Sequence, residues 1–489
     1  MTSLVKALKT LVCTALIFCM STVQAQLKIP SQELALPELG DSSSSTFSLQ
    51  QEYKLGRAWL MSFRSQVRTI SDPLLQDYLE HIIYDLATYS ELKDRRLDVI
   101  IVDNPTINAF AVPGGVVGVH NGLLTYAETE AQLATVLAHE LAHLSQRHFA
   151  RGVEQQKRNS IPNMAGLLAG IILAATAGGD AGMAAIAATQ AASLQSQLRY
   201  SRLHEQEADR VGMQTMVRAD LDPNAAAVMF ENMLKASRYA GSRPPEFLLT
   251  HPVTESRVSD ARNRARQFPR KVYTDSHNYQ LMRARVEVSM HENSKDAVNV
   301  FRTQLKQGSK HHEADEYGLI LALTKNAQYA EARQRLKPLL DNSPSQIAYI
   351  IADADLNIQQ GFYQQAVDEL REQLALTPGN HPLTMTLAGA LLKNNQPQYA
   401  EQLLQAHSKL KPNNPDVWYL LAETHGLAGN IVGVHQARAE YFVLNGILDK
   451  AQQQLAYALP LVKSNHLTSV RITERIRQIE QLKQSLKKL

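Results

Sequence analysis

Residues 139–143 read His-Glu-Leu-Ala-His, within a run over residues 129–149 that contains no Pro or Gly and is rich in Ala and Leu. This composition predicts a helix. On a helix, positions i and i+4 share one face, so His139 and His143 would present two imidazole nitrogens to one metal ion. Glu140 lies one position along, where its carboxylate would reach a water molecule beside that ion without being a ligand.

The pattern H-E-x-x-H is typical of zinc peptidases, in which the Glu is the general base and the metal needs a third protein ligand. Residues 201–210 read SRLHEQEADR and offer candidates. Glu205 and Asp209 share a helix face, so Glu205 can be the ligand while Asp209 accepts the second N–H of a ligand histidine. His204 remains a rival that would give a three-histidine site. Glu207 is a second rival, and otherwise lies on a solvated face.

The first 25 residues have the pattern of a cleaved secretory signal. Lys6 and Lys9 precede an uncharged, mostly apolar run over residues 11–20, and Val23-Gln24-Ala25 then gives the small-x-small pattern of a cleavage site. The apolar run is shorter than the roughly 20 residues of a spanning helix. We therefore expect an exported chain, in which a Ser-rich arm or linker over residues 26–49 follows the signal.

Composition places the 489 residues among ordinary globular proteins, with 44% hydrophobic and 20% charged residues. The formal charge of +3 is too small to indicate nucleic-acid binding. Both cysteines, Cys13 and Cys19, lie in the signal segment. The exported chain thus has no disulfide and no catalytic thiol.

The segment 50–270 has mixed patterning. We expect helices over residues 51–67 and 73–89, a strand over 97–102, and a hairpin that joins 109–112 to 116–120 through Pro113-Gly114-Gly115. The second hairpin strand is expected to be an edge strand beside the metal, available to an extended substrate. The alternative is an interior strand.

Residues 160–195 connect the candidate metal helix to the third ligand. Residues 164–175 are an unbroken apolar run of about a dozen residues, which is too short to span a membrane. This segment is expected to be a mobile lid over the cleft, or else to lie on a membrane surface.

The C-terminal part is repetitive. Prolines recur at positions 344, 378 and 412, and alanines at 297, 332 and 366, with spacings of 34 or 35 residues. A period of 34 built from two helices is typical of tetratricopeptide repeats, with small residues where the helices approach closely. We predict five or six repeats over residues 275–489.

Taken together, HELAH, the later SRLHEQEAD, the segment NAFAVPGG (108–115) and Thr250-His251-Pro252 resemble the gluzincin peptidases, which include the CAAX-prenyl endopeptidases. The resemblance implies one Zn²⁺ per chain, with His139, His143 and Glu205 as ligands. Glu140 and Asp209 would be catalytic. His251 would donate to the oxyanion, or enter the open coordination position and hold the enzyme latent, or else be a plain structural histidine next to Pro252.

The predicted fold is mostly α: a gluzincin-type α+β metalloprotease domain with a small β-sheet (50–270), then an α-solenoid of repeats (275–489). A signal, this peptidase domain and C-terminal repeats occur together in periplasmic members of the family. The resemblance therefore implies a periplasmic endopeptidase that degrades misassembled envelope proteins, with outer-membrane β-barrel proteins and their assembly machinery as partners. The alternative is a repeat-based chaperone or scaffold with a latent metal site. An integral-membrane prenyl-protein protease would need spanning helices, which the sequence lacks. His120 is expected to line the cleft, and His148 to lie on the surface.

Overall fold

The computed structural model describes residues 48–157, 202–239 and 246–486. These residues belong to one compact unit that spans residues 46–489. The predicted signal segment, nearly all of the N-terminal arm, and the apolar segment 160–195 lie outside the described residues. Within the described ranges, no helix combines the length and the apolarity needed to cross a bilayer.

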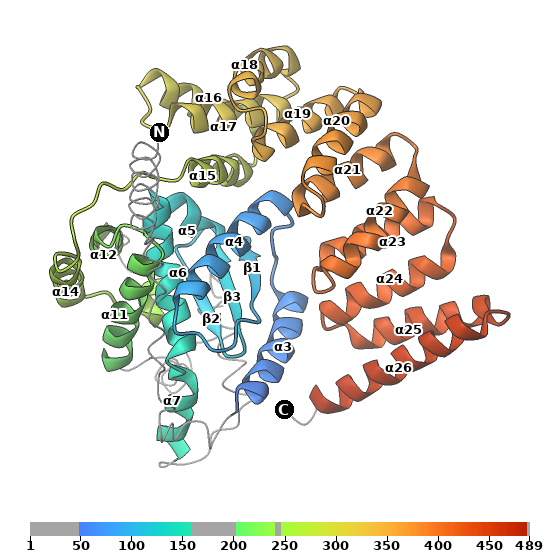
Figure 1. Cartoon of the computed structure of the whole chain (residues 1–489), viewed down its shortest axis with the longest axis horizontal. Coiled ribbons are helices and arrows are strands. Elements are labelled where there is room, and N and C mark those ends of the chain that lie inside the picture. The colour runs from blue at the N-terminus through green and yellow to red at the C-terminus, as the bar shows by residue number, and fades with distance from the viewer. Residues whose placement is uncertain (1–47, 158–201, 240–245, 487–489) are drawn as a thin grey trace, which may run out of the picture. The chain divides into compact units, whose positions relative to one another are not determined.

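The first part of the chain is a small sheet surrounded by helices (Figure 1). Its elements are α3 (Leu49–Gln66), α4 (Pro73–Tyr89), β1 (Asp98–Val102), β2 (Ala109–Val112), β3 (Val116–His120), α5 (Asn121–Tyr126), α6 (Glu130–Ser145), α7 (His148–Lys157), α11 (Arg202–Arg218), α12 (Asn224–Tyr239), α13 (Glu246–Thr250) and α14 (Glu255–Ala265). The predicted strand and hairpin are therefore present.

The sheet has the strand order β1-β3-β2, so the expectation that residues 116–120 form an edge strand was wrong. β3 pairs with β1 in parallel on one side and with β2 antiparallel on the other, and all five of its residues are buried. Its nearly continuous apolar sequence, Val-Val-Gly-Val-His, suits a strand buried on both faces. β2 is the edge strand of the hairpin. Gly114 and Gly115 make the turn with φ of 87° and 84°, a conformation that glycine adopts without strain.

α6 is a central buried helix. The Thr129 side chain accepts a hydrogen bond from the Gln132 backbone at its start. The helix packs against α4, α11, α12 and β2. It ends at Ser145, four residues before the predicted end, because Arg147 adopts a left-handed φ of 51°. The chain thus turns and restarts as α7 at His148.

The rest of the chain is a series of helix pairs. They are α15 (His277–Met290) with α16 (Ser294–Lys306), α17 (His312–Lys325) with α18 (Tyr329–Asn342), α19 (Ile347–Gln359) with α20 (Tyr363–Leu376), α21 (His381–Lys393) with α22 (Pro397–Leu410), α23 (Pro415–Leu427) with α24 (Ile431–Leu444), and α25 (Leu448–Ala458) with α26 (His466–Leu486), the last two joined by the 3₁₀ turn η1 (Leu459–Val462). The expectation of a mostly helical fold with a small sheet and a solenoid is confirmed.

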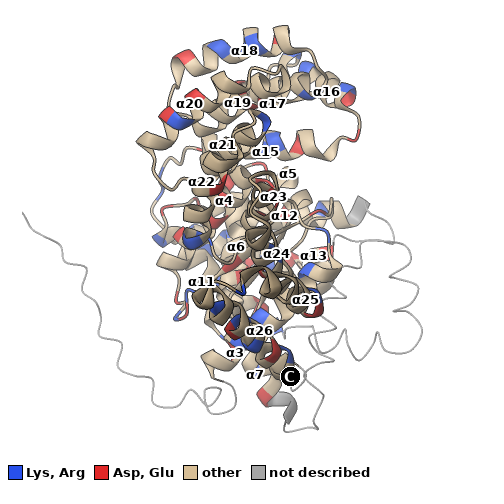
Figure 2. Cartoon of the chain, turned by 90° about the vertical axis from the view of Figure 1, so that its right-hand side faces the viewer, with Lys and Arg blue, Asp and Glu red and all other residues tan. Residues whose placement is uncertain are grey.

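The periodic residues of the sequence have the structural role expected of them. Ala297, Ala332 and Ala366 are fully buried. Pro344, Pro378 and Pro412 lie in the connections between successive helix pairs. Each pair buries its apolar face mainly against its neighbours, as in other solenoids. Acidic and basic residues are interspersed on the repeat helices (Figure 2), in keeping with the small net charge.

The helix pairs also contact the sheet-containing part. The Tyr279 hydroxyl donates to the backbone carbonyls of Leu124 and Ala127, at 2.9 and 2.7 Å. Arg285 Nε lies 2.7 Å from the carboxylate of Asp72, the N-cap residue of α4. α15 is therefore the first helix of the solenoid and also packs against α5 in the sheet-containing part.

Candidate metal centre

Four buried side chains converge at the centre of the first part. His139, His143, Glu205 and His251 each offer one ligand atom, and these atoms lie within 4.8 Å of one another. The Nε2 atoms of His139 and His143 are 3.0 Å apart, and the Glu205 oxygens lie 3.4 and 3.5 Å from them. Bond lengths of 2.0–2.1 Å place the ligand atoms of a tetrahedral zinc about 3.3 Å apart. The observed spacing therefore fits one small cation.

The fourth member, His251, is held by local structure. His251 follows α13, whose Phe247 amide donates to the Ile107 carbonyl just before β2. The Phe247 ring stacks on the His251 ring, with centroids 4.8 Å apart. His251 Nδ1 consequently lies 3.1 Å from Glu205 Oε1 and 3.4 Å from His139 Nε2. It occupies the position of a ligand atom in the cluster.

Close packing of α6 against α11 brings Glu205 to the two histidines. A Cβ atom on Gly212 would lie only 3.1 Å from backbone atoms of Ala138 and His139. Glycine therefore permits the two helices to approach closely at this point. Of the three residues that the sequence left as possible third ligands, the structure brings Glu205 into the cluster. His204 and Glu207 lie outside it.

The Nδ1 atom of His139 faces a carboxylate, as the sequence predicted. Asp209 Oδ1 lies 2.9 Å from it, and Arg257 pairs with both Asp209 oxygens at 2.7 Å. Burial would raise the pKa of Asp209, but the charge of Arg257 and the hydrogen bond from His139 hold it below its ordinary value. Burial would lower the pKa of His139, yet Asp209 and Glu205 raise it to about 9. The centre thus favours a positive charge.

Glu140 lies beside the cluster and is not part of it. It is buried, and burial raises the pKa of its carboxyl group. The backbone N–H of Ala111 on β2 donates to it, while its Oε1 atom has no hydrogen-bond partner among the described residues and lies 3.6 Å from His251 Nε2. A buried carboxylate oxygen in this position could accept a proton from a reactant at the centre.

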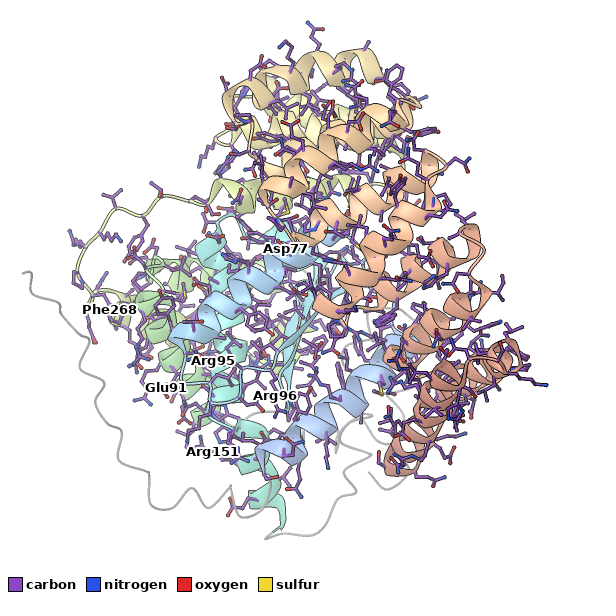
Figure 3. The ribbon with its side chains drawn as sticks, turned by 45° about the vertical axis from the view of Figure 1, so that its right-hand side comes forward. Asp77, Glu91, Arg95, Arg96, Arg151 and Phe268 are labelled. Carbon is purple, nitrogen blue, oxygen red and sulfur yellow. The ribbon has the colours of Figure 1, made fainter. Side chains whose placement is uncertain are left out.

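The prediction that His148 lies on the surface was wrong, because the residue is only 1% exposed. Its Nδ1 atom lies 2.7 Å from Nδ1 of His143, and its Nε2 atom lies 3.1 Å from Glu207 Oε2. Arg151 of α7 (Figure 3) pairs with the same oxygen at 2.9 Å. Glu207 is therefore engaged by these side chains and is not part of a solvated face. Burial and the neighbouring His204, whose ring stacks on it, lower the pKa of His148 to about 4.

His120 is also buried, at the end of β3, but outside the cluster. Its Nδ1 atom lies 2.9 Å from the Thr106 hydroxyl, which donates to Glu246. Burial lowers the pKa of His120 to about 4. Its polar neighbours thus come from the connection before β2 and from the start of α13, and its expected place in the cleft stays a prediction.

The fold and the centre define a class: metallopeptidases with the H-E-x-x-H helix and a carboxylate ligand on a second helix. Comparison with known proteins agrees. Residues 73–265 match peptidase family M48, and residues 357–424 match a tetratricopeptide repeat family. The chain belongs to peptidase family M48.

Among its relatives, the β-barrel assembly-enhancing protease of Escherichia coli K12 is 35% identical over 481 residues, which cover 98% of each chain. The protein of the same name from Yersinia pestis is 34% identical and covers 95% of each chain. The mitochondrial metalloendopeptidase OMA1 of Schizosaccharomyces pombe is 32% identical over 181 residues, which cover 37% of this chain and 50% of that one.

Proposed function

We propose that this metallopeptidase is a zinc-dependent endopeptidase of the periplasm that degrades misassembled envelope proteins and promotes assembly of outer-membrane β-barrel proteins. The observation that carries the enzymatic part is the convergence of His139, His143 and Glu205 at tetrahedral spacing. Two relatives that align with this chain over 98% and 95% of their length are named β-barrel assembly-enhancing protease, and these names support the substrate class. The signal pattern over residues 1–25 supports export.

The chemistry we propose is amide hydrolysis. A divalent cation bound by the three ligands would polarise the scissile carbonyl and make a water molecule more acidic. Glu140 would take the proton of the attacking water at its free Oε1 atom and pass it to the leaving amine. Asp209 would hold His139 in the tautomer that leaves Nε2 free to bind the cation.

We propose that substrate pairs with β2, replacing the expectation for β3. The His120 amide donates to the Asn108 carbonyl. The backbone N–H and C=O groups of residues 108, 110 and 112 therefore point towards β3, whereas those of residues 109 and 111 point away from it. The Ala111 amide on that outer side donates to Glu140. A peptide added along β2 would therefore place its carbonyl groups beside the general base.

We further propose that His251 holds the resting enzyme latent. Its Nδ1 atom lies among the ligand atoms, at 3.1 Å from Glu205, where it can complete the coordination of the cation. This position supports the latency role over the oxyanion role that the sequence left open. Activation would require α13 to move, because Phe247 and His251 are anchored together.

A chaperone or scaffold function is the second candidate, and the helix pairs over residues 277–486 favour it. Solenoids of this kind offer a surface for protein partners without chemistry of their own. The two functions are compatible in one chain.

The test of the enzymatic function is casein hydrolysis by the full exported chain before and after metal removal. Dialysis against a chelator should abolish hydrolysis, and one equivalent of Zn²⁺ should restore it. Mn²⁺ or Co²⁺ should restore part of it if the donor set is as proposed. A chain that binds no metal, or that hydrolyses casein equally well after chelation, would leave only the scaffold function.

A further inference from the structure

The two histidines of α6 differ in what their second ring nitrogen contacts. His139 Nδ1 faces the carboxylate of Asp209, the arrangement expected from the sequence. His143 Nδ1 instead faces another imidazole, that of His148, at 2.7 Å. This distance is that of a hydrogen bond, so one of the two nitrogens carries the proton and the other accepts it.

Metal binding at His143 decides which nitrogen is the donor. A histidine that gives the lone pair of Nε2 to a cation carries its proton on Nδ1. His143 must then donate to His148 Nδ1, so the proton of His148 lies on Nε2. That atom is 3.1 Å from Glu207 Oε2, which accepts the hydrogen bond. Arg151 completes the series by pairing with the same oxygen at 2.9 Å.

The backbone turn after α6 brings His148, the next member of this series, against His143. The left-handed residue Arg147 turns the chain at the end of α6, so that His148 at the start of α7 lies beside His143. The Arg147 side chain pairs with buried Glu52 on α3 at 3.0 Å, which holds the turn. On the other side, α11 supplies Glu205 to the cluster and Glu207 to His148.

We propose that His148 is a positioning residue: it fixes the tautomer and ring orientation of His143, and Glu207 with Arg151 fixes the tautomer of His148. The proposal rests on the metal site of the proposed function. It assigns a role to residues that neither the motif nor the ligand set includes. Partners of this kind typically change metal affinity 10–100-fold when they are removed.

The experiment compares two replacements of His148 in the full exported chain. His148→Phe keeps a planar aromatic ring but removes both nitrogens. His148→Asn places an amide oxygen near the position of Nδ1 and can still accept from His143. We measure the Zn²⁺ dissociation constant by chelator competition, and the visible absorption spectrum of the Co²⁺-substituted protein. His204→Phe, which preserves the stacking on His148, is the matched control.

We expect His148→Phe to weaken Zn²⁺ binding roughly 10–100-fold and to alter the Co²⁺ spectrum. His148→Asn should recover most of the affinity, and the control should behave as wild type. Wild-type affinity and spectrum in His148→Phe would overturn the proposal. Equal losses in His148→Phe, His148→Asn and His204→Phe would also overturn it, because packing alone would then explain the effect.

A second pair of variants keeps the test decisive if His148→Phe does not fold. Glu207 is partly exposed, with 25% of its side chain accessible, and tolerates change more readily. Glu207→Gln keeps an acceptor for His148, whereas Glu207→Ala removes it. Weaker Zn²⁺ binding in Glu207→Ala than in Glu207→Gln supports the proposal, and equal affinities contradict it. Failure of the wild type itself to bind metal would refute the proposed function instead.

Discussion

Two clusters of buried histidines in this chain differ in what they can do. At the end of α6, Glu205 lies beside His139 and His143, and a second carboxylate, that of Asp209, faces His139 Nδ1. In the repeats, His381 and His407 lie with Nδ1 and Nε2 2.9 Å apart and nearly parallel rings, and Asn414 and Lys411 are their polar neighbours. The first cluster contains carboxylates, and its nitrogen and oxygen lone pairs converge on one point. The second is a neutral hydrogen-bonded pair.

The difference shows what separates a metal centre from a buried polar contact. Imidazole is present in both clusters, but only the first also supplies one carboxylate as a candidate ligand and a second carboxylate that faces a ring nitrogen. Among the described residues, the cluster at α6 is the one group whose donor atoms converge for a metal ion. The proposed chemistry therefore belongs to the M48 part, and the helix pairs are the basis of the proposed scaffold role.

The largest expected effect tests whether the α6 cluster is catalytic. Glu140→Gln removes the proton acceptor while keeping the size of the side chain, so casein hydrolysis should fall by roughly 10²–10⁴-fold. Metal content should remain that of the wild type, because Glu140 is not a ligand. Glu130→Gln on the same helix, which still accepts from the Tyr78 hydroxyl, should keep full activity. Full activity of Glu140→Gln would contradict the proposed mechanism.

The next effect concerns the carboxylate that orients His139. Asp209→Asn removes the negative charge facing His139 Nδ1 and leaves Arg257 without its bidentate partner. Zn²⁺ affinity should fall roughly 10–100-fold. Asp220→Asn just beyond α11 is the control, since Asp220 is exposed and Asn tolerates its left-handed φ of 62°. Unchanged affinity in Asp209→Asn would show that the carboxylate is not needed to orient the ring.

The third prediction concerns the fourth ring of the cluster. His251→Ala frees the position beside Glu205, so basal casein hydrolysis should rise severalfold with metal retained. A fall in activity at full metal content would instead support oxyanion donation. Metal analysis of the same sample separates either result from simple loss of the cation.

Sequence reasoning succeeded where the information is local. The i, i+4 spacing of His139 and His143, and the 34-residue period that buries Ala366, follow from helix geometry alone. Prediction from the sequence failed where the backbone changes direction and where a strand from another part of the chain pairs with the predicted one. Nothing in Gln146-Arg147 indicates the left-handed turn that buries His148. Pairing of β3 with β1 depends on a parallel partner 18 residues earlier in the register, and no pattern in residues 116–120 specifies it.

The site was predictable only in part for a related reason. Glu205, His204 and Glu207 have equally good ligand chemistry in the sequence, and helix spacing alone could not choose among them. The close approach of α6 and α11 at Gly212 determines which one reaches the histidines. His251 came from resemblance, because no spacing rule connects it to a motif more than a hundred residues away.

The fourth prediction tests the repeats as packing. Ala366 is fully buried between helices of the solenoid. Ala366→Leu should overpack that contact and lower the free energy of unfolding of the repeats by about 1–3 kcal/mol, seen as a lower Tm by circular dichroism. Ala375→Leu on the exposed side of α20 is the control and should have little effect. An unchanged Tm for Ala366→Leu would show that the helix pairs do not depend on the small residue.

The smallest effect at neutral pH is expected at the second histidine cluster. His381→Gln should leave metal content unchanged and cost about 0.5–1.5 kcal/mol for a weakened hydrogen bond. A loss of bound Zn²⁺ in this variant would erase the distinction between the two clusters.

The same variant should reveal its role under acid conditions. Burial, with the charges of His407 and Lys411, lowers the pKa of His381 to about 3. In the folded chain His381 therefore stays unprotonated between about pH 6.5 and pH 3, whereas in the unfolded chain, where its pKa is near 6.5, it binds a proton in this pH range. The contribution of neutral His381 to the free energy of unfolding is therefore complete above about pH 6.5, and it is lost progressively as the pH falls towards 3. The Tm of the wild type should thus fall more steeply between pH 7 and pH 5 than that of His381→Gln, measured by circular dichroism. Parallel curves would show that the histidine pair carries no protonation penalty.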